Sequence, residues 1–229
     1  MPSAVEQLAK NANWGALAKA TELKQRLLFV VIALLVYRLG TYIPIPGIDP
    51  HVWNEIFTQK GGGILDLFNM FSGGALQPMT IFALNIMPYI SASIIMQLAS
   101  SLSPQLEAMK KEGESGRLRI NQYTRYLTVL LAAVQAYGLA VGLEGMQGSG
   151  GSAVIDPGFM FRISTVITIV GGTIFLMWLG EQITARGVGN GTSLIIYAGI
   201  VANLPLAVAS TLELGRQGQF SFLSLLLIA

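Results

Sequence analysis

Long runs without a charged residue alternate with short polar segments along this chain. The first run, residues 27–43, contains one charged residue, Arg38, near its far end. Residues 67–106 form an uncharged stretch of 40 residues, too long for one membrane-spanning helix and too short for two with an ordinary loop. The later runs each have the length of a spanning helix. The pattern predicts an all-α fold, a polytopic membrane helix bundle.

The runs and their breaks predict five complete transmembrane helices plus the start of a sixth, with a broken second helix. No signal-peptide cleavage site follows the first run, so we expect it to stay as a membrane helix. The predicted segments are a cytoplasmic N-terminus at 1–26, helix 1 at 27–43, a short half-helix region at 61–75, helix 2 at 77–102, a cytoplasmic loop at 107–125, helix 3 at 124–143, helix 4 at 159–180, helix 5 at 192–212 and the start of helix 6 at 220–229.

Composition and charge agree with a lipid environment. Hydrophobic residues make up 52% of the chain and charged residues 11%, whereas soluble domains carry about 25% charged residues. The absence of cysteine excludes disulfides and thiolate metal sites. Of the 14 lysines and arginines, ten fall on the side of the predicted bundle that holds the N-terminus. The N-terminus is therefore predicted to be cytoplasmic.

The break before helix 2 is the first feature that indicates a function. Glycines at 73 and 74 and a proline at 78 interrupt the apolar run, leaving a short piece at 64–71. Eight helical residues cover about 12 Å, less than half of the hydrocarbon thickness. A half-helix at membrane depth persists only where protein buries it or where it lines a watery cavity. We therefore predict a pathway through the membrane; an amphipathic loop on the outer face is the alternative.

Six short motifs stand out along the chain: DLFNMFSGGA at 66–75, IMPYISAS at 86–93, KKEGE at 110–114, QYTRY at 122–126, MWLGEQIT at 177–184 and RGVGNG at 186–191. These motifs closely resemble the SecY family, the channel subunits of bacterial protein translocases. The matches follow family order and spacing over residues 27–214, and because the family has ten spanning helices, the chain corresponds to its first half.

The resemblance implies a function and a set of partners. The expected function is the central pore-forming subunit, which passes unfolded secretory polypeptides across the bacterial plasma membrane and membrane-protein segments laterally into it. The expected partners are SecE as a clamp, SecG as an accessory subunit, the SecA motor or the ribosome on the cytoplasmic side, and membrane lipids. Neither a cofactor nor specific nucleic-acid binding is expected.

The resemblance also assigns site residues. Ile86 and Ile90, and likewise Thr192 and Ile196, fall on pore-ring positions, and each pair is spaced to share a helix face. Without the resemblance, such isoleucines indicate ordinary helix packing. Ser91 falls on the lateral gate. The plug comprises Gly61, Gly62, Gly63, Ile64, Leu65, Asp66, Leu67, Phe68, Asn69, Met70, Phe71, Ser72, Gly73 and Gly74; the cytoplasmic contacts are Lys110, Lys111, Arg117 and Arg119.

No catalytic chemistry is visible in the sequence. His51 is the only histidine, and no nucleophile–base pair or metal-ligand spacing accompanies it. The chain is therefore predicted not to be an enzyme. An ion-coupled secondary transporter is the main alternative, although the carboxylates other than Asp66 fall in loops or at helix ends. Arg38 and Arg162 are expected to snorkel toward the outer surface, and a purely structural scaffold is a further alternative.

Overall fold

The computed structural model describes residues 21–60, 69, 72–148 and 151–216. Over these residues the fold is helical, which confirms the predicted fold class. A single hairpin of two-residue strands pairs Gln147 with Ser152 and Gly148 with Gly151. The elements are α3 (Thr21–Gly40), α4 (Pro50–Lys60), α6 (Met87–Leu102), α7 (Pro104–Lys111), α8 (Glu114–Glu144), β1 (Gln147–Gly148), β2 (Gly151–Ser152), α9 (Phe159–Arg186) and α10 (Gly191–Arg216).

Within the described part of the chain, two helices are long and apolar enough to cross a membrane by themselves. These are α8 and α9, with 31 and 28 residues. α3 carries arginines and a lysine among its 20 residues, and α6 has only 16. The predicted membrane bundle is thus supported, whereas the number of complete spans stays a prediction.

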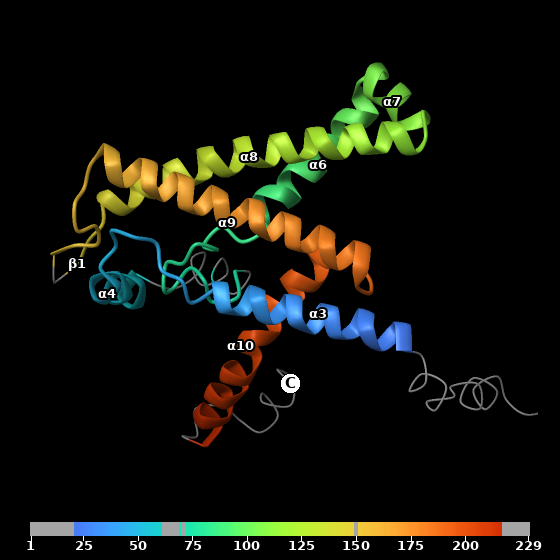
Figure 1. The fold of residues 1–229 in the computed structure, drawn as a ribbon. Coiled ribbons are helices and arrows are strands. Elements are labelled where there is room, and N and C mark those ends of the chain that lie inside the picture. The colour runs from blue at the N-terminus through green and yellow to red at the C-terminus, as the bar shows by residue number, and fades with distance from the viewer. Residues whose placement is uncertain (1–20, 61–68, 70–71, 149–150, 217–229) are drawn as a thin grey trace, which may run out of the picture.

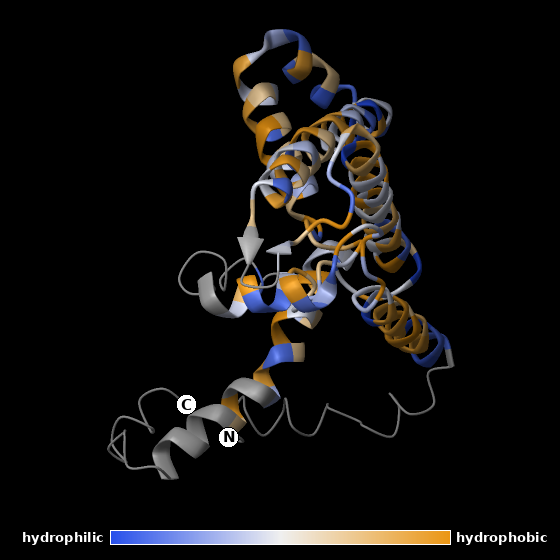
Figure 2. Ribbon diagram, turned by 90° about the vertical axis from the view of Figure 1, so that its left-hand side faces the viewer, coloured by the Kyte–Doolittle hydropathy of each residue, from blue (hydrophilic) through white to orange (hydrophobic). Residues whose placement is uncertain are grey.

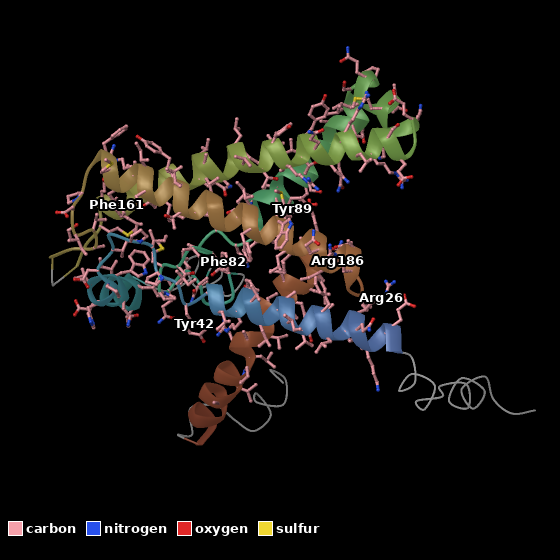
Figure 3. All side chains as sticks on the ribbon, in the orientation of Figure 1. Arg26, Tyr42, Phe82, Tyr89, Phe161 and Arg186 are labelled. Carbon is pink, nitrogen blue, oxygen red and sulfur yellow. The ribbon has the colours of Figure 1, made fainter. Side chains whose placement is uncertain are left out.

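The helices pack around α9. α8 and α9 run side by side as a long antiparallel hairpin, α6 packs on α8, and α3 and α10 pack on α9 (Figure 1). Arg26 and Arg186 lie at one end of the bundle and Phe161 lies at the other (Figure 3). The cations predicted to be cytoplasmic therefore share one end, together with α7 and the start of α8.

Exposed apolar side chains line the faces of the helices that point away from the bundle. On α8, the apolar or aromatic side chains of Tyr126, Leu130, Val134 and Tyr137 are all more than half exposed. Figure 2 shows hydrophobic residues along the lengths of the long helices. Soluble monomers rarely expose continuous apolar surfaces of this extent, because contact with water is unfavourable. The exposed rows are the expected boundary with lipid.

Small residues form the inner face of α8. Thr124, Thr128, Ala132, Ala136 and Ala140 recur every four positions and are buried. Such a row lets neighbouring backbones approach closely, which is how helices associate in membranes. Both threonine hydroxyls donate to the carbonyl four residues earlier, so no polar group of this row is left unsatisfied.

A small folded cap covers the end of the bundle that holds Phe161. Its helix α4 buries Trp53, Ile56 and Phe57, which pack with Val154 and Phe161 in one cluster. The chain before α4 pairs with the segment that follows β2, since the Ile155 N–H donates to the Gly47 carbonyl at 3.0 Å. The predicted segments assign no helix between residues 43 and 61. His51 lies on the exposed face of α4.

The helices α6 and α8 begin at residues other than the predicted ones. The second span is helical only from Met87, and residues 77–86 are turns apart from Thr80, which forms an isolated bridge with Pro44. Pro88 lies in the first helical turn, where a missing N–H costs nothing. The predicted loop at 107–125 is largely helical: α8 begins at Glu114 and is about 46 Å long, longer than the hydrocarbon core.

The remaining predictions fall in part outside the described residues. Of the predicted plug, only positions 69 and 72–74 are described. Positions 61–68, 70 and 71, the start of helix 6 at 220–229, and residues 1–20 lie outside the described part.

Candidate functional site

Fifteen consecutive non-helical residues, 72–86, run through the centre of the bundle. Their backbone groups bond to another irregular stretch: the Ile45 N–H donates to the Met79 carbonyl at 2.9 Å, and the Ile81 N–H donates to the Ile43 carbonyl at 3.0 Å. Met79 is 1% exposed and lies at a positive φ of 49°. The broken segment (residues 72–86) thus combines bonds within its own turns, such as the Ala83 N–H to the Thr80 carbonyl at 2.9 Å, with bonds to a distant stretch of the chain. Irregular structure at membrane depth requires such pairing inside the protein.

Aromatic rings and a glycine fix the broken segment between α3 and α9. The Phe82 ring stacks on Tyr37 of α3 and on Phe175 of α9, with centroid distances of 6.1 and 6.0 Å. Gly172 of α9 lies directly against the Ile81 carbonyl, where a side chain would not fit. The segment is therefore clamped from both sides. Figure 3 shows Phe82 near the C-terminal end of α3, far from Arg26.

The described end of the predicted plug is held by side chains of α3. The Tyr37 hydroxyl donates to the Ser72 carbonyl at 3.4 Å, and Arg38 Nη1 donates to the Gly73 carbonyl at 2.8 Å. Asn69 ties the same turn together, since its carbonyl accepts from the Gly74 N–H at 2.8 Å. The expectation that Arg38 snorkels outward stays a prediction: its Nη1 reaches the buried Gly73 carbonyl, whereas its Nη2 reaches the exposed Tyr42 hydroxyl.

Three of the four predicted ring residues meet in one apolar cluster between α3, α6, α9 and α10. Ile86 is a buried member, and Ile90 and Ile196 pack against the cluster while partly exposed. The Ile90 N–H donates to the Ile86 carbonyl at 3.1 Å, so Ile86 caps α6 and Ile90 lies on its first turn. With 1% exposure, Ile86 does not match a residue that faces a central conduit.

The fourth ring residue, Thr192, lies on the wall of a polar cavity of about 470 Å³. We call this cavity the vestibule; it opens at the end of the bundle that holds Arg186. Arg125 and Glu181 form a two-pronged ion pair on its wall, Nε to Oε1 and Nη2 to Oε2, both at 2.8 Å. The lining residues are Tyr89, Asn121, Arg125, Glu181, Gln182, Thr184, Ala185, Asn190 and Thr192.

The turn between α9 and α10 determines where Thr192 sits. Asn190 caps α10, its side-chain oxygen accepting from the Ser193 N–H at 3.3 Å. The Gly191 N–H donates to the Thr184 hydroxyl at 2.9 Å, and a side chain at Gly191 would collide with the Gly180 carbonyl. This tight turn places Thr192 one helical turn nearer the vestibule than Ile196.

The predicted cytoplasmic contacts divide into two groups. Lys110 and Arg117 line a second cavity of about 210 Å³ between α6, α7 and α8. Lys111 instead pairs with Glu107 at 2.7 Å along α7, and Arg119 is exposed on α8. All four cations are exposed. Ser91 is partly exposed on α6, next to Ile90.

The sequence reading missed two arrangements of the site. It did not join Arg125 to Glu181, which lie 56 positions apart in the chain, and it did not bring Tyr37 and Arg38 to the turn at 72–74. The contact of Arg38 with the turn could have been expected, because a cation inside a predicted span needs a partner. No local sequence pattern indicates the pairing of Arg125 with Glu181.

The comparisons with known proteins agree with these features. The SecY family profile matches residues 80–229. The protein translocase subunit SecY of Escherichia coli (strain K12) is 60% identical over 208 residues, which are 91% of this chain and 47% of that protein. The SecY subunit of Pseudomonas aeruginosa is 57% identical over 221 residues, 96% of this chain and 49% of that protein. The chain thus spans about half the length of the curated relatives it matches.

Solved structures share the fold. A protein-conducting channel superposes with a TM-score of 0.52 at 22% identity, covering 84% of this chain and 38% of that one. Sec61 from a canine ribosome–channel complex gives the same values. The broken segment, the family profile over 80–229 and the two close bacterial relatives lead to one assignment: the chain belongs to the SecY family of membrane proteins.

Proposed function

We propose that this chain forms one half of the wall of a protein-conducting channel, the central pore-forming subunit of a bacterial translocase. The channel passes unfolded polypeptides across the plasma membrane and releases apolar segments sideways into lipid. The described residues contribute the broken segment, the ring positions and the vestibule. Because the chain covers half the length of its relatives, the rest of the conduit wall comes from residues beyond this sequence.

The observation that carries the proposal is the broken segment inside a bundle of membrane helices. Residues in a helix form their backbone hydrogen bonds within that helix. A membrane protein with a purely structural role therefore needs no interruption of this kind. Fifteen irregular residues retained at this depth indicate a structural element with another purpose. A central conduit with a movable stopper at its outer side accounts for that element, and the predicted plug directly precedes it.

The ring is proposed to lie between the vestibule and the apolar cluster. Ile90 and Ile196 offer partly exposed aliphatic surface there, and Thr192 borders the vestibule. A narrow aliphatic constriction resists ions by dewetting while it deforms around a moving chain. We assign Ile86 to the support behind the ring because it is buried in the described half.

The other site residues extend this proposal. Ser91, beside Ile90 on α6, is placed on the lateral gate. Lys110, Lys111, Arg117 and Arg119 are exposed at the cytoplasmic end, where they suit contact with anionic lipid and with the SecA motor or the ribosome. SecE and SecG are the proposed membrane partners, and the N-terminus is placed in the cytoplasm.

Crosslinking to a stalled polypeptide tests the conduit. Cysteines replace Ile90 or Ile196 at the ring, and Ile167, which is 67% exposed on the outer face of α9, serves as a matched control. The complete channel carries each variant and is loaded with a secretory chain that cannot finish crossing. The proposal expects crosslinks from Ile90→Cys and Ile196→Cys and none from Ile167→Cys. Equal labelling at all three positions would contradict it.

A flux measurement separates the proposal from its rivals. The complete channel with its partners, reconstituted in vesicles, is tested for polypeptide crossing driven by SecA and for solute uptake driven by an ion gradient. Polypeptide crossing supports the proposal, and solute uptake supports an ion-coupled transporter. The absence of both kinds of flux supports a purely structural scaffold. Chain 1–229 produced alone should not restore secretion in a depleted strain, whereas co-production with the residues that follow it should.

A further inference from the structure

Arg38 is a cation within the first membrane helix whose partners in the structure are uncharged. Its guanidinium donates to the Gly73 carbonyl at 2.8 Å and to the Tyr42 hydroxyl at 3.4 Å, and it lies 5.3 Å from the Tyr42 ring centre. Among the residues that the structure describes, it forms no ion pair. A charge at membrane depth is costly, so its retention indicates a function tied to its partner.

The partner is a turn with two adjacent carbonyls that no helix can satisfy. Tyr37 donates to the Ser72 carbonyl, which also accepts from the Ala75 N–H at 3.4 Å, and Arg38, the next residue, donates to the Gly73 carbonyl. Ser72 and Gly73 are both buried. A buried carbonyl without a donor is destabilising, and the donor that the structure gives the Gly73 carbonyl is Arg38. The side chains of α3 therefore help to hold this turn inside the bundle.

α10 forms the opposite wall of the same turn. The backbones of Gly73 and Gly199 touch: a Cβ placed on Gly199 would lie 3.2 Å from the Gly73 Cα and 3.1 Å from the Tyr37 hydroxyl. Gly73 has a φ of +70°, a conformation that favours glycine. Gly199 lies about 12 Å along α10 from its start at Gly191, close to the middle of a hydrocarbon core of about 30 Å.

We propose that Tyr37 and Arg38 act as a latch: their hydrogen bonds to the Ser72 and Gly73 carbonyls hold the turn at 72–74 against Gly199 and so keep the resting channel closed. The latch rests on the proposed conduit function and adds positioning residues to it. Neutral acceptors suit this task, because hydrogen bonds to a carbonyl can be exchanged for water when the turn leaves, without separating an ion pair in lipid.

Thiol labelling of the complete channel tests the latch. The 229 residues contain no cysteine, so Ala75→Cys supplies a unique thiol within them; Ala75 is 0% exposed beside the turn. Added to this background, Arg38→Met should raise the rate of labelling by a water-soluble reagent about tenfold or more, since losing one buried partner costs about 1.4 kcal/mol or more. Resting ion conductance should rise with it, and Arg38→Lys should restore part of the shielding.

Two matched controls distinguish a latch from general loosening. Tyr37→Phe should raise labelling at position 75, whereas Tyr42→Phe, the same change without a contact to the turn, should not. Ala136→Cys, equally buried on α8, should stay unreactive in every variant. Faster labelling at both thiols, or unchanged labelling at position 75 in Arg38→Met, overturns the latch. Polypeptide crossing is measured in parallel: its absence in the parent channel would refute the proposed function instead.

Discussion

The packing of α9 on the broken segment can be tested at two adjacent glycines. Gly172 lies against the backbone of Ile81, whereas Gly171 has nothing within 4 Å of the position a Cβ would take. Replacing either with alanine should give the same gain in intrinsic helix stability, about 1 kcal/mol. Any difference between the two variants therefore reports the contact with the broken segment.

The size of that difference follows from the geometry. A Cβ on Gly172 would lie 2.1 Å from the Ile81 carbonyl oxygen, and ordinary contact begins at 3.4 Å, so α9 or the segment must move by about 1.3 Å. The obstacle is backbone that is itself hydrogen-bonded to Ile43, so a rotamer change cannot relieve it. Overpacking of this kind costs about 1–3 kcal/mol. We expect Gly172→Ala to be less stable than Gly171→Ala by that amount.

Thermal unfolding of the complete channel in detergent, at one fixed scan rate, provides the measurement. A difference of about 2 kcal/mol corresponds to an apparent Tm lower by several degrees for Gly172→Ala. Gly171→Ala should equal or exceed the parent protein. If Gly172→Ala unfolds at or above the temperature of Gly171→Ala, the broken segment does not lie against α9 and the described centre of the bundle is incorrect.

Three further expectations follow from single contacts. Trp53→Phe removes the hydrogen bond from Nε1 to the Leu76 carbonyl, a loss of about 1 kcal/mol in the free energy of unfolding, and should therefore lower the apparent Tm in the same assay. An unchanged apparent Tm would exclude a contribution from this bond. A double-mutant cycle with Arg125→Met and Glu181→Gln should give a coupling of about 1 kcal/mol or less that shrinks as salt is raised, because the pair is partly exposed. Thr192→Ile should leave polypeptide transport intact and slightly reduce resting ion leak in bilayer recordings; an equal or higher leak argues against its place in the ring.

Motifs and backbone signals gave part of the structure correctly. Helix 4 was predicted to begin at residue 159, where α9 begins, because a glycine and a proline precede the apolar run. The interruption after residue 71 was also predicted, from glycines that break helices. α4 was missed although Pro50 at its start and the spacing of Trp53, Ile56 and Phe57 are typical of an amphipathic helix. At 11 residues, α4 is too short to stand out as a long apolar run.

Hydropathy is enough to identify the segments that leave water, and the positions of the charges predict the end of the bundle at which the cations gather, because transfer free energy depends on residue type and on little else. The path of residues 77–86 depends instead on tertiary packing, since hydropathy is the same for a lipid-facing helix and for a turn buried in protein. The difference lies in where each backbone N–H finds its acceptor. For the Ile81 N–H that acceptor is the Ile43 carbonyl, 38 positions earlier in the chain. The guanidinium of the Arg38 side chain likewise finds the Gly73 carbonyl. Such partners exist only once the helices have packed.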